Sequence, residues 1–277
     1  MAARRRLDAE LVRRELVTSR SVAQQLIDDD RVFVNGAVAA KAARQVSPAD
    51  AIVIEGPPAR FVGRGAEKLE HALSEFAIDV DGLRLLDAGA STGGFTDCLL
   101  QRGACEVVAV DVGHGQLHER LRADERVVNL ERQNIRDIDL DVVGGPVDGV
   151  GGELSFISLR LVISPLVSVC QPGALMVLLV KPQFEAGRSE VSRGRGIVTD
   201  PAIHERVCAQ VGDALTAARC TIHGWTTSPI TGADGNVEFL VHATAPDASG
   251  VAGDDVTASG ATEVDNELAG RDRSSTS

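Results

Sequence analysis

Four ionisable residues stand at the start or end of predicted elements, and together they could move a proton. Lys181 ends the apolar run 175–180, Glu153 ends "VDGVGGE", and Glu238 lies near the start of "VEFLVHA". Lys68 lies in "RGAEKLEHAL", whose apolar spacing predicts a helix. Two amines and two carboxylates suit the deprotonation of a weakly acidic hydroxyl group. For each residue alone, the alternative of an exposed charge at the end of an element stays open.

The lysine at position 181 is informative because the chain otherwise uses arginine. Of the 28 basic residues, three are lysines, at positions 41, 68 and 181. Arginine stays protonated, whereas the pKa of a lysine falls when its amine loses solvent or lies beside a second ammonium. Lowering a lysine pKa from about 10.4 by ~3 units costs about 4 kcal/mol. The sequence therefore predicts that Lys181 acts as a general base.

A glycine-containing loop, "LLDAGASTGGFTD", predicts a ligand site at the end of a strand. Its spacing, G-x-x-x-G-G, differs from the G-x-G-x-x-G of dinucleotide folds, and Asp87 just before it would repel a phosphate. A carboxylate beside such a loop suits a ligand with a cationic end, such as the amino-acid portion of S-adenosylmethionine. Asp111 ends the next strand, 24 residues after Asp87, where an acid that binds a ribose diol belongs. This pattern predicts a methyltransferase; a generic tight turn is the alternative.

We expect the cofactor to contact the loop and the ends of the next two strands. Asn134, after the third strand, is a candidate for the adenine side, although an Asn there is often only a turn residue. The predicted cofactor-binding residues are Asp87, Gly89, Ala90, Ser91, Thr92, Gly93, Asp111 and Asn134.

These residues need a parallel sheet to bring them together. Strand and helix patterns alternate between residues 65 and 245, which predicts an α/β, Rossmann-like sheet of seven strands with helices on both faces. The last two strands are joined by "SPITGADGN", which is too short for a crossover helix, so we expect the last strand to be antiparallel. The predicted strands are 83–89, 106–112, 126–131, 147–153, 175–181, 221–227 and 237–243, and the predicted helices are 65–77, 94–102, 115–122, 156–170 and 201–218.

Composition divides the chain into four parts. Residues 1–57 predict a small α+β domain with an Asn-Gly turn, 58–64 a linker, 65–245 the large domain, and 246–277 a disordered acidic tail. The net charge is −12, yet residues 1–64 hold 11 basic and 8 acidic side chains. A basic end on an acidic body is compatible with nucleic-acid binding by one module.

Several functional classes are not expected. No apolar run approaches the roughly 20 residues that span a bilayer, and acidic residues interrupt the amino-terminal segment where a signal peptide would be apolar. The five cysteines form no C-x-x-C pair, which favours reduced thiols in a cytoplasmic protein. The histidines have no metal-ligand spacing, so no metal is expected.

The motifs "LDAGASTGGFTD", "LSFISLR", "LVKPQFE" and "GNVEF", in this order, resemble the TlyA family of ribosomal RNA 2′-O-methyltransferases, some of which carry the name hemolysin. The resemblance covers residues 1 to about 245. It implies an FtsJ-like methyltransferase domain, S-adenosylmethionine as donor, and cytidine 2′-hydroxyls of ribosomal RNA or ribosomal subunits as acceptors. It also implies a Lys-Asp-Lys-Glu tetrad, which maps to Lys68, Glu153, Lys181 and Glu238.

The tetrad departs from the family pattern at one position. Glu153 stands where the family has Asp, so its carboxylate is carried one methylene further into a site where ~1 Å matters. Asp148 cannot replace it, because it lies ~16 Å away along the strand and faces the other side. We expect a functional but slower centre in which Glu153 still orients Lys181.

The amino-terminal segment resembles the small RNA-binding module of ribosomal protein S-four. Without aromatic residues among its basic ones, it favours binding by RNA shape through phosphate contacts. A second basic segment, "EAGRSEVSRGRGIVTD", predicts a mobile loop that clamps RNA. The predicted RNA-binding residues are Arg4, Arg5, Arg6, Arg20, Lys41, Arg44, Arg188, Arg193 and Arg195. A solvated basic helix and an ordinary surface loop are the alternatives.

Three other functions stay open at this point. The family's historical name suggests a membrane-active cytolysin, which needs an amphipathic or spanning segment. The amino-terminal module also occurs in pseudouridine synthases, which use no donor cofactor. Glu153 leaves room for an RNA-binding ribosome assembly factor with impaired catalysis.

Overall fold

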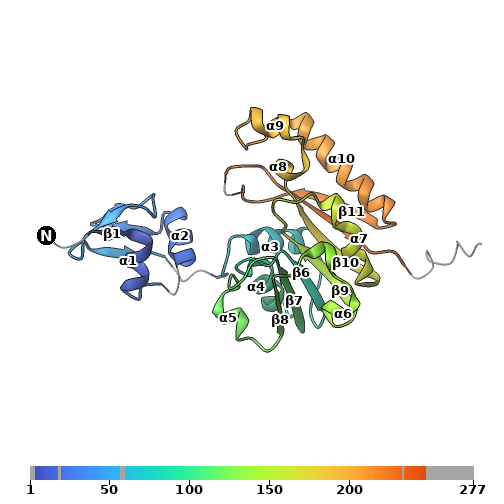
Figure 1. The fold of residues 1–277 in the computed structure, drawn as a ribbon, viewed down its shortest axis with the longest axis horizontal. Helices are drawn as coiled ribbons and strands as arrows, with labels where there is room; N and C mark the ends of the chain where they lie inside the picture. The colour runs from blue at the N-terminus through green and yellow to red at the C-terminus, as the bar shows by residue number, and fades with distance from the viewer. Residues whose placement is uncertain (1–3, 18–19, 57–59, 233, 248–277) are drawn as a thin grey trace, which may run out of the picture.

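The large domain is built on one mixed sheet of seven strands (Figure 1). The computed structural model describes residues 4–17, 20–56, 60–232 and 234–247. The strand order is β11-β12-β10-β9-β6-β7-β8. The strands are β6 (Arg84–Ala88), β7 (Glu106–Asp111), β8 (Val127–Glu131), β9 (Val147–Gly152), β10 (Cys170–Val180), β11 (Thr221–Thr227) and β12 (Phe239–Thr244).

The strand directions confirm the predicted sheet. Strands β6, β7, β8, β9 and β10 pair parallel with one another, whereas β12 pairs antiparallel with both β10 and β11. In the β10–β12 register Val180 lies opposite Phe239, so the next residues along it are Lys181 and Glu238. Gly152 lies opposite Ala88 of β6 and Leu178 of β10, which brings Glu153 to the same edge. The register thus collects residues from distant parts of the chain.

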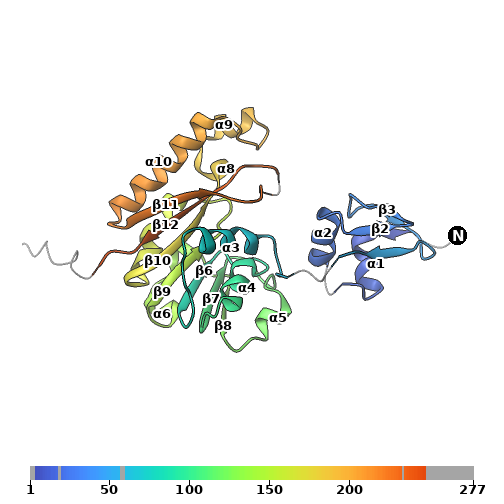
Figure 2. The same cartoon turned by 180° about the vertical axis from the view of Figure 1, so that it is seen from behind.

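Helices cover both faces of the sheet (Figures 1 and 2). Helices α3 and α4 bury leucine, alanine and phenylalanine side chains against alternate residues of β6, β7 and β10, and α7 and α10 do the same on the other face. The helices are α3 (Gly65–Glu75), α4 (Gly94–Gln101), α5 (Glu119–Arg122), α6 (Leu140–Val143), α7 (Ile163–Ser168), α8 (Pro182–Glu185), α9 (Arg188–Arg193) and α10 (Pro201–Ala217), with short 3-10 turns η1 (Ile135–Asp137) and η2 (Leu159–Leu161).

Two predicted helices are shorter than expected. The helix expected at 115–122 begins at Glu119, because Gly115 has a φ of +66°, outside the helical region. The helix expected at 156–170 is divided into η2 and α7. Phe156 has a φ of +61° and cannot start a helix, and Pro165 is accommodated in the first turn of α7.

The amino-terminal domain has a core of its own. Buried Leu7, Leu11, Ile27, Val32 and Val34 form it. The elements are β1 (Arg5–Arg6), α1 (Leu7–Arg13), α2 (Arg20–Asp28), β2 (Val32–Val34), β3 (Ala37–Val38), β4 (Gln45–Val46) and β5 (Ile52–Ile54). The predicted Asn-Gly turn is present between β2 and β3, and both of its residues have positive φ. The pairing of β1 with β4 was not expected from the sequence.

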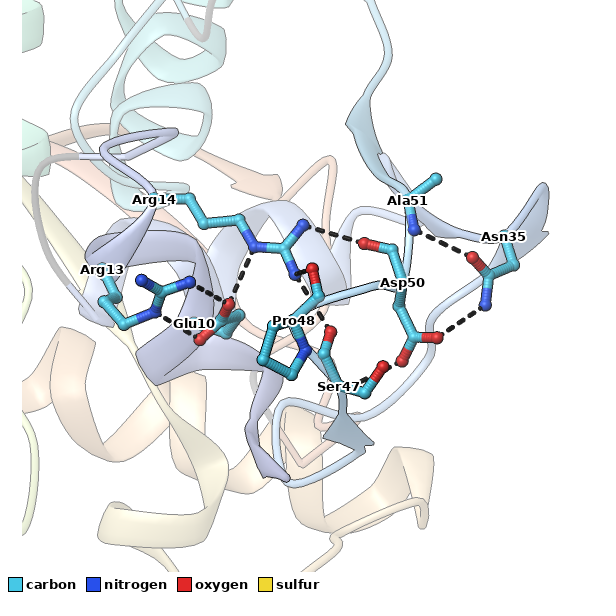
Figure 3. A network of polar contacts seen from close by, with 8 residues as sticks. All are labelled: Glu10, Arg13, Arg14, Asn35, Ser47, Pro48, Asp50 and Ala51. Atoms are coloured by element: carbon cyan, nitrogen blue, oxygen red, sulfur yellow. Dashed lines mark hydrogen bonds and ion pairs between the residues drawn. The ribbon is translucent and has the colours of Figure 1, made fainter. Parts of the chain in front are cut away.

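A polar network ties helix α1 to the loop before β5 (Figure 3). Arg14 donates to the carbonyl oxygens of Asp50 at 2.8 Å and Ser47 at 3.1 Å, and its Nε donates to Glu10. Asn35 donates to the Asp50 carboxylate at 3.0 Å. The guanidinium of Arg14 therefore serves the fold, because it satisfies carbonyl groups that no strand pairs.

Residues expected in the linker take part in packing. Phe61 is buried in the core cluster of α3 and α4, and the backbone N–H of Val62 donates to Asp97 at 2.9 Å. The domain boundaries stay predictions, and most of the acidic tail predicted at 246–277 lies outside the described residues.

Asp87 is a carboxylate buried completely at the end of β6. Its Oδ2 accepts hydrogen bonds from the backbone N–H and the hydroxyl of Thr96, at 2.8 and 2.6 Å, whereas its Oδ1 has no partner in the described part of the chain. Burial raises the pKa of Asp87 to about 7, and the Thr96 bonds offset only part of that rise.

The raised pKa of Asp87 predicts a pH-dependent stability. The folded chain keeps this proton up to about pH 7, whereas the unfolded chain releases it near pH 4. The free energy of unfolding therefore falls as the pH rises from about 4 to about 7. The substitution Asp87→Asn replaces the carboxyl group with an amide, which stays uncharged over this pH range. In thermal unfolding without ligand, the free energy of unfolding of the variant, relative to that of the original chain, should rise by about 2 to 3 kcal/mol from pH 5 to pH 8. A difference that stays constant with pH would contradict the assignment.

Candidate active site

Lys68 lies between two carboxylates from distant parts of the chain. Helix α3 presents its ammonium, Glu153 follows β9, and Glu238 precedes β12. The Nζ of Lys68 is 2.8 Å from Glu153 Oε1 and 2.7 Å from Glu238 Oε2. Lys68 is 5% exposed and Glu238 is 2% exposed, so this ion pair is largely removed from water. Charge-assisted bonds of this length offset the cost of burying the charges.

Lys181 contacts the same oxygen of Glu153 as Lys68 does. Its Nζ lies 3.3 Å from Glu153 Oε1 and donates to the Ser155 hydroxyl at 3.2 Å. The Oε1 atom of Glu153 thus joins the two lysines. The sequence predicted that Lys68, Glu153, Lys181 and Glu238 converge, and the structure brings all four together at one edge of the sheet.

The partners decide the charge states of this cluster. Burial alone would lower the pKa of Lys68, but Glu153 and Glu238 outweigh it and raise that pKa above its usual value. Burial would raise the pKa of Glu153, but the ammonium groups of Lys181 and Lys68 outweigh it and lower that pKa. Lys68 therefore stays a cation and Glu153 an anion at neutral pH.

Two glycines leave the space that the carboxylates occupy. A Cβ at Gly65, the first residue of α3, would collide with Glu153 Oε2, and a Cβ at Gly232 would lie 2.7 Å from Glu238 Oε1. The extra methylene of Glu153 is therefore accommodated by the bare backbone of Gly65. The sequence did not predict this contact, because nothing near Gly65 in the chain indicates it.

A cavity of about 360 Å³ opens directly onto the cluster. A second cavity of about 530 Å³ adjoins it and shares Gly89, Ser91, Glu153, Ser155 and Phe156 with the first. Of the predicted cofactor-binding residues, the first cavity is lined by Gly89, Ala90, Ser91 and Thr92, and the second by Gly89, Ser91, Asp111 and Asn134.

The carboxylate of Asp111 shapes the glycine loop. Its Oδ2 accepts from the Ser91 N–H at 2.8 Å, and its Oδ1 accepts from the Gly113 N–H at 2.7 Å. Each oxygen retains a lone pair that a ligand hydroxyl can use. Asn134 uses its side-chain oxygen on the Arg136 N–H at 3.0 Å, which caps η1. Its predicted binding role and its turn role are compatible, because the side-chain nitrogen of Asn134 takes no part in that contact.

Asp87 and Gly93 line neither cavity, so the direct ligand contact expected of them is not what the structure shows. Asp87 is fully buried behind the loop, and Gly93, with a φ of +99°, caps α4 beneath Leu121. Gly89 fits its expected role better. Its φ is +87°, and a Cβ there would lie 2.6 Å from the Glu153 carbonyl oxygen.

These groups fit a cofactor that is cationic at one end and carries a ribose. The buried Oδ1 of Asp87 lies beneath the loop without a partner in the described part of the chain, and Asp111 stands at the neighbouring strand end. Acidic side chains line both cavities, and the backbone N–H groups of Gly89, Ala90 and Ser91 already donate within the protein, which suits an aminoacyl nucleoside better than a phosphate.

Several residues that line the first cavity were not predicted from the sequence. Gln183 donates to Glu238 Oε1 at 3.3 Å, and Ser155 accepts from Lys181. Both follow strand ends inside motifs already singled out, so the position alone was a signal. Phe156 is 91% exposed at the mouth of the site and lies 5.0 Å from the ring of Phe184. An exposed phenylalanine gives no such signal in the sequence.

The predicted RNA-binding residues of the amino-terminal domain lie at its surface. Arg4, Arg5, Arg6, Arg20 and Lys41 are exposed, and Arg44 is half-buried. Arg6 and Arg20 both form ion pairs with Asp8.

The second basic segment is more structured than the expected loop. Helix α9 lies within it, because Glu190 accepts from the Gly187 N–H and Asn236 binds both Gly196 and Val198. Arg195 is exposed beyond α9, and the side chains of Arg188 and Arg193 lie outside the described ones.

The described residues show neither a metal site nor a membrane-spanning helix. No group of three or more His, Cys, Asp or Glu is placed to hold a metal ion. No helix in the described ranges is long and apolar enough to cross a membrane.

Two family models match this chain. The family model of FtsJ-like methyltransferases matches residues 61–245, and the S4 domain model matches residues 5–52. The chain is 48% identical to the 16S/23S rRNA (cytidine-2′-O)-methyltransferase TlyA of Mycobacterium tuberculosis, over 87% of this chain and 90% of that protein.

Other relatives carry a different name. Hemolysin A of Brachyspira hyodysenteriae is 40% identical over 86% of this chain and 98% of its own length. A solved structure from Streptococcus thermophilus, whose description also contains the word hemolysin, matches with a TM-score of 0.70 and 37% identity, over 89% of this chain and 90% of that one. The matched spans and the convergent cluster show that this chain belongs to the FtsJ-like methyltransferases, within the TlyA family.

Proposed function

We propose that this chain transfers a methyl group from S-adenosylmethionine to the 2′-hydroxyl of a cytidine ribose in ribosomal RNA. The observation that carries the proposal is the Glu153 oxygen shared by Lys68 and Lys181 beside the cavity of the glycine loop. The names of the relatives support the acceptor, and the S4 match supports RNA as the partner.

In this proposal Lys181 is the general base. A ribose hydroxyl attacks a methyl group only as its proton leaves, so an amine must stand beside it in the uncharged form. Lys181 is held by one contact of 3.3 Å to Glu153 and one to Ser155, whereas Lys68 has two shorter bonds to carboxylates. The less tightly paired lysine is the one assigned as the base in this proposal.

The other members of the cluster hold Lys181 and its surroundings. Lys68 remains a cation and contacts the same Glu153 oxygen as Lys181 does. Glu238 is the second counterion of Lys68, and Gln183 donates to the other oxygen of Glu238 at 3.3 Å. Glu153 orients both lysines from a fixed position. Bound S-adenosylmethionine would supply the electrophilic methyl group.

The residues around the two cavities would hold the cofactor. Asp111 would accept hydrogen bonds from the ribose hydroxyls, and Asn134 would lie at the adenine side. The backbone from Gly89 to Thr92 would border the methionine portion. Asp87 would lie beneath the loop without touching the cofactor, since it has no exposed surface. The exposed arginines of the amino-terminal domain and Arg195 would contact RNA phosphates.

A ribosome assembly factor with impaired catalysis is less well supported than an enzyme. That alternative rested on the longer side chain of Glu153. The carboxylate nevertheless lies within 3.3 Å of both lysines, and Gly65 provides the room it needs. The cluster is complete despite the substitution.

Replacing the proposed base should stop methyl transfer. In Lys181→Arg the charge remains, but the guanidinium cannot accept the proton. Tritium transfer from labelled S-adenosylmethionine to ribosomal subunits from a strain lacking this gene should fall by on the order of 10²-fold or more. Binding of S-adenosylmethionine, followed by calorimetry, should change little. Glu205→Gln, on the exposed side of α10, is the control and should transfer as the original chain does.

Unchanged transfer by Lys181→Arg would exclude Lys181 as the base. Methylated nucleosides recovered from the product identify the base and the ribose position. A product methylated on the base rather than the ribose would contradict the proposed reaction itself.

The fit of Glu153 against Gly65 can be tested by compensation. Gly65→Ala should displace the Glu153 carboxylate and lower turnover by about tenfold or more, because misplacement by ~1 Å is costly at a reacting centre. The double variant Gly65→Ala with Glu153→Asp shortens the acid and should recover most of the lost turnover. Far-UV circular dichroism checks that both variants fold. If the double variant were as slow as the product of the two single effects, the packing argument would be wrong.

A further inference from the structure

Asp8 is a buried carboxylate that holds two exposed arginines. It is 3% exposed, whereas the side chains of Arg6 and Arg20 are 47% and 60% exposed. Arg6 donates from Nε and Nη2 at 3.0 Å each, and Arg20 donates from Nη2 at 2.6 Å and from Nε at 3.3 Å. The two arginines come from β1 and α2, so this one carboxylate fixes how far apart their guanidinium groups lie.

Both arginines use the same edge of the guanidinium for Asp8. The Nη1 group of each has no partner in the described part of the chain, so its two N–H donors stay available at the surface. A paired guanidinium has already lost much of its rotamer freedom. A phosphate that binds it therefore meets donors in a fixed orientation, at a lower entropic cost than with a free arginine.

A second buried carboxylate in the same helix serves a different purpose. Glu10 is 1% exposed and also binds two arginines, Arg13 and Arg14 (Figure 3). Arg14 spends its other donors on the carbonyl oxygens of Ser47, Pro48 and Asp50. This network joins two segments of the domain, whereas the Asp8 cluster leaves donors facing outward.

We propose that Asp8 is a positioning residue for RNA: it sets Arg6 and Arg20 as a pair of guanidinium groups that bind the phosphate backbone of the substrate. The inference rests on the proposed function and adds an acidic residue to a surface where only basic ones were expected. The chemistry it would recognise is two phosphate oxygens on neighbouring nucleotides.

Charge and position make opposite predictions for the same variant. Asp8→Asn makes the surface more positive, so a purely electrostatic surface would bind RNA more tightly. If Asp8 positions the arginines, the variant binds its specific substrate less well although it is more basic. Glu10→Gln makes the same change in charge two residues further along the same helix and is the matched control.

The experiment measures methyl transfer to small and large ribosomal subunits from a strain lacking this gene, with saturating S-adenosylmethionine. Asp8→Asn should raise KM for the subunit substrate about tenfold and leave kcat within about twofold. Its elution from heparin should need equal or higher salt than that of the original chain. Glu10→Gln should shift heparin elution in the same direction and leave KM within about twofold.

Two results would overturn the inference. One is an unchanged or lower KM for Asp8→Asn, and the other is an equal rise in KM for both variants, which would show loss of local folding rather than of positioning. Thermal unfolding of each variant accompanies the kinetics.

Arg20→Lys covers the case in which Asp8→Asn does not fold. It keeps the charge at an exposed position but loses the two-pronged contact with Asp8. KM should rise about as much as for Asp8→Asn, with heparin elution unchanged; a KM equal to that of the original chain would reject the inference. If the original chain transferred no methyl group, the proposed function would fail, and cosedimentation of the same variants with the subunits would still decide the role of Asp8.

Discussion

The site depends on one oxygen atom, Oε1 of Glu153, which contacts the ammonium groups of both Lys68 and Lys181. Burying a charge costs several kcal/mol unless partners with good geometry surround it. Here three charged side chains from α3, β9 and β10 meet, and Glu238 completes the set from β12. Both the parallel and the antiparallel strand registers must be kept for these side chains to meet, because a shift of one residue would turn Lys181 or Glu238 to the other face of the sheet.

The same region contains buried polar atoms that the protein itself leaves unsatisfied. Within the described part of the chain these are Asp87 Oδ1 and Gln183 Oε1, and both belong to residues in or directly behind the candidate site. An unpaired buried polar atom costs about 1 to 3 kcal/mol. Such a cost is usually found where function requires it, because a ligand or water can satisfy the atom later. These unpaired atoms therefore lower the stability of the sheet at its functional edge.

Lysine and arginine have separate uses in this chain. Arginine forms the two-pronged contacts of the amino-terminal domain, where Asp8 and Glu10 each hold two guanidinium groups. Lysine occupies the two basic positions of the candidate site: Lys68 stays a cation between two carboxylates, and Lys181 stands where the proposed reaction needs a group that can lose its proton. A buried carboxylate in this chain can therefore stabilise the fold, hold arginines at the surface or belong to the candidate site, and the residues that it binds decide which.

The sequence alone determined the order and type of the main elements and the members of the charged cluster. All seven strands of the sheet were predictable because apolar runs of the right length alternate with helical patterns, and strand ends in a parallel sheet must meet at one edge. Only the tertiary structure decided that Gly65 makes room for Glu153, that Asp87 lies behind the loop rather than in the cavity, and that Asp8 joins Arg6 to Arg20. Each of these depends on distances between side chains far apart in the chain, which periodicity and residue type do not encode.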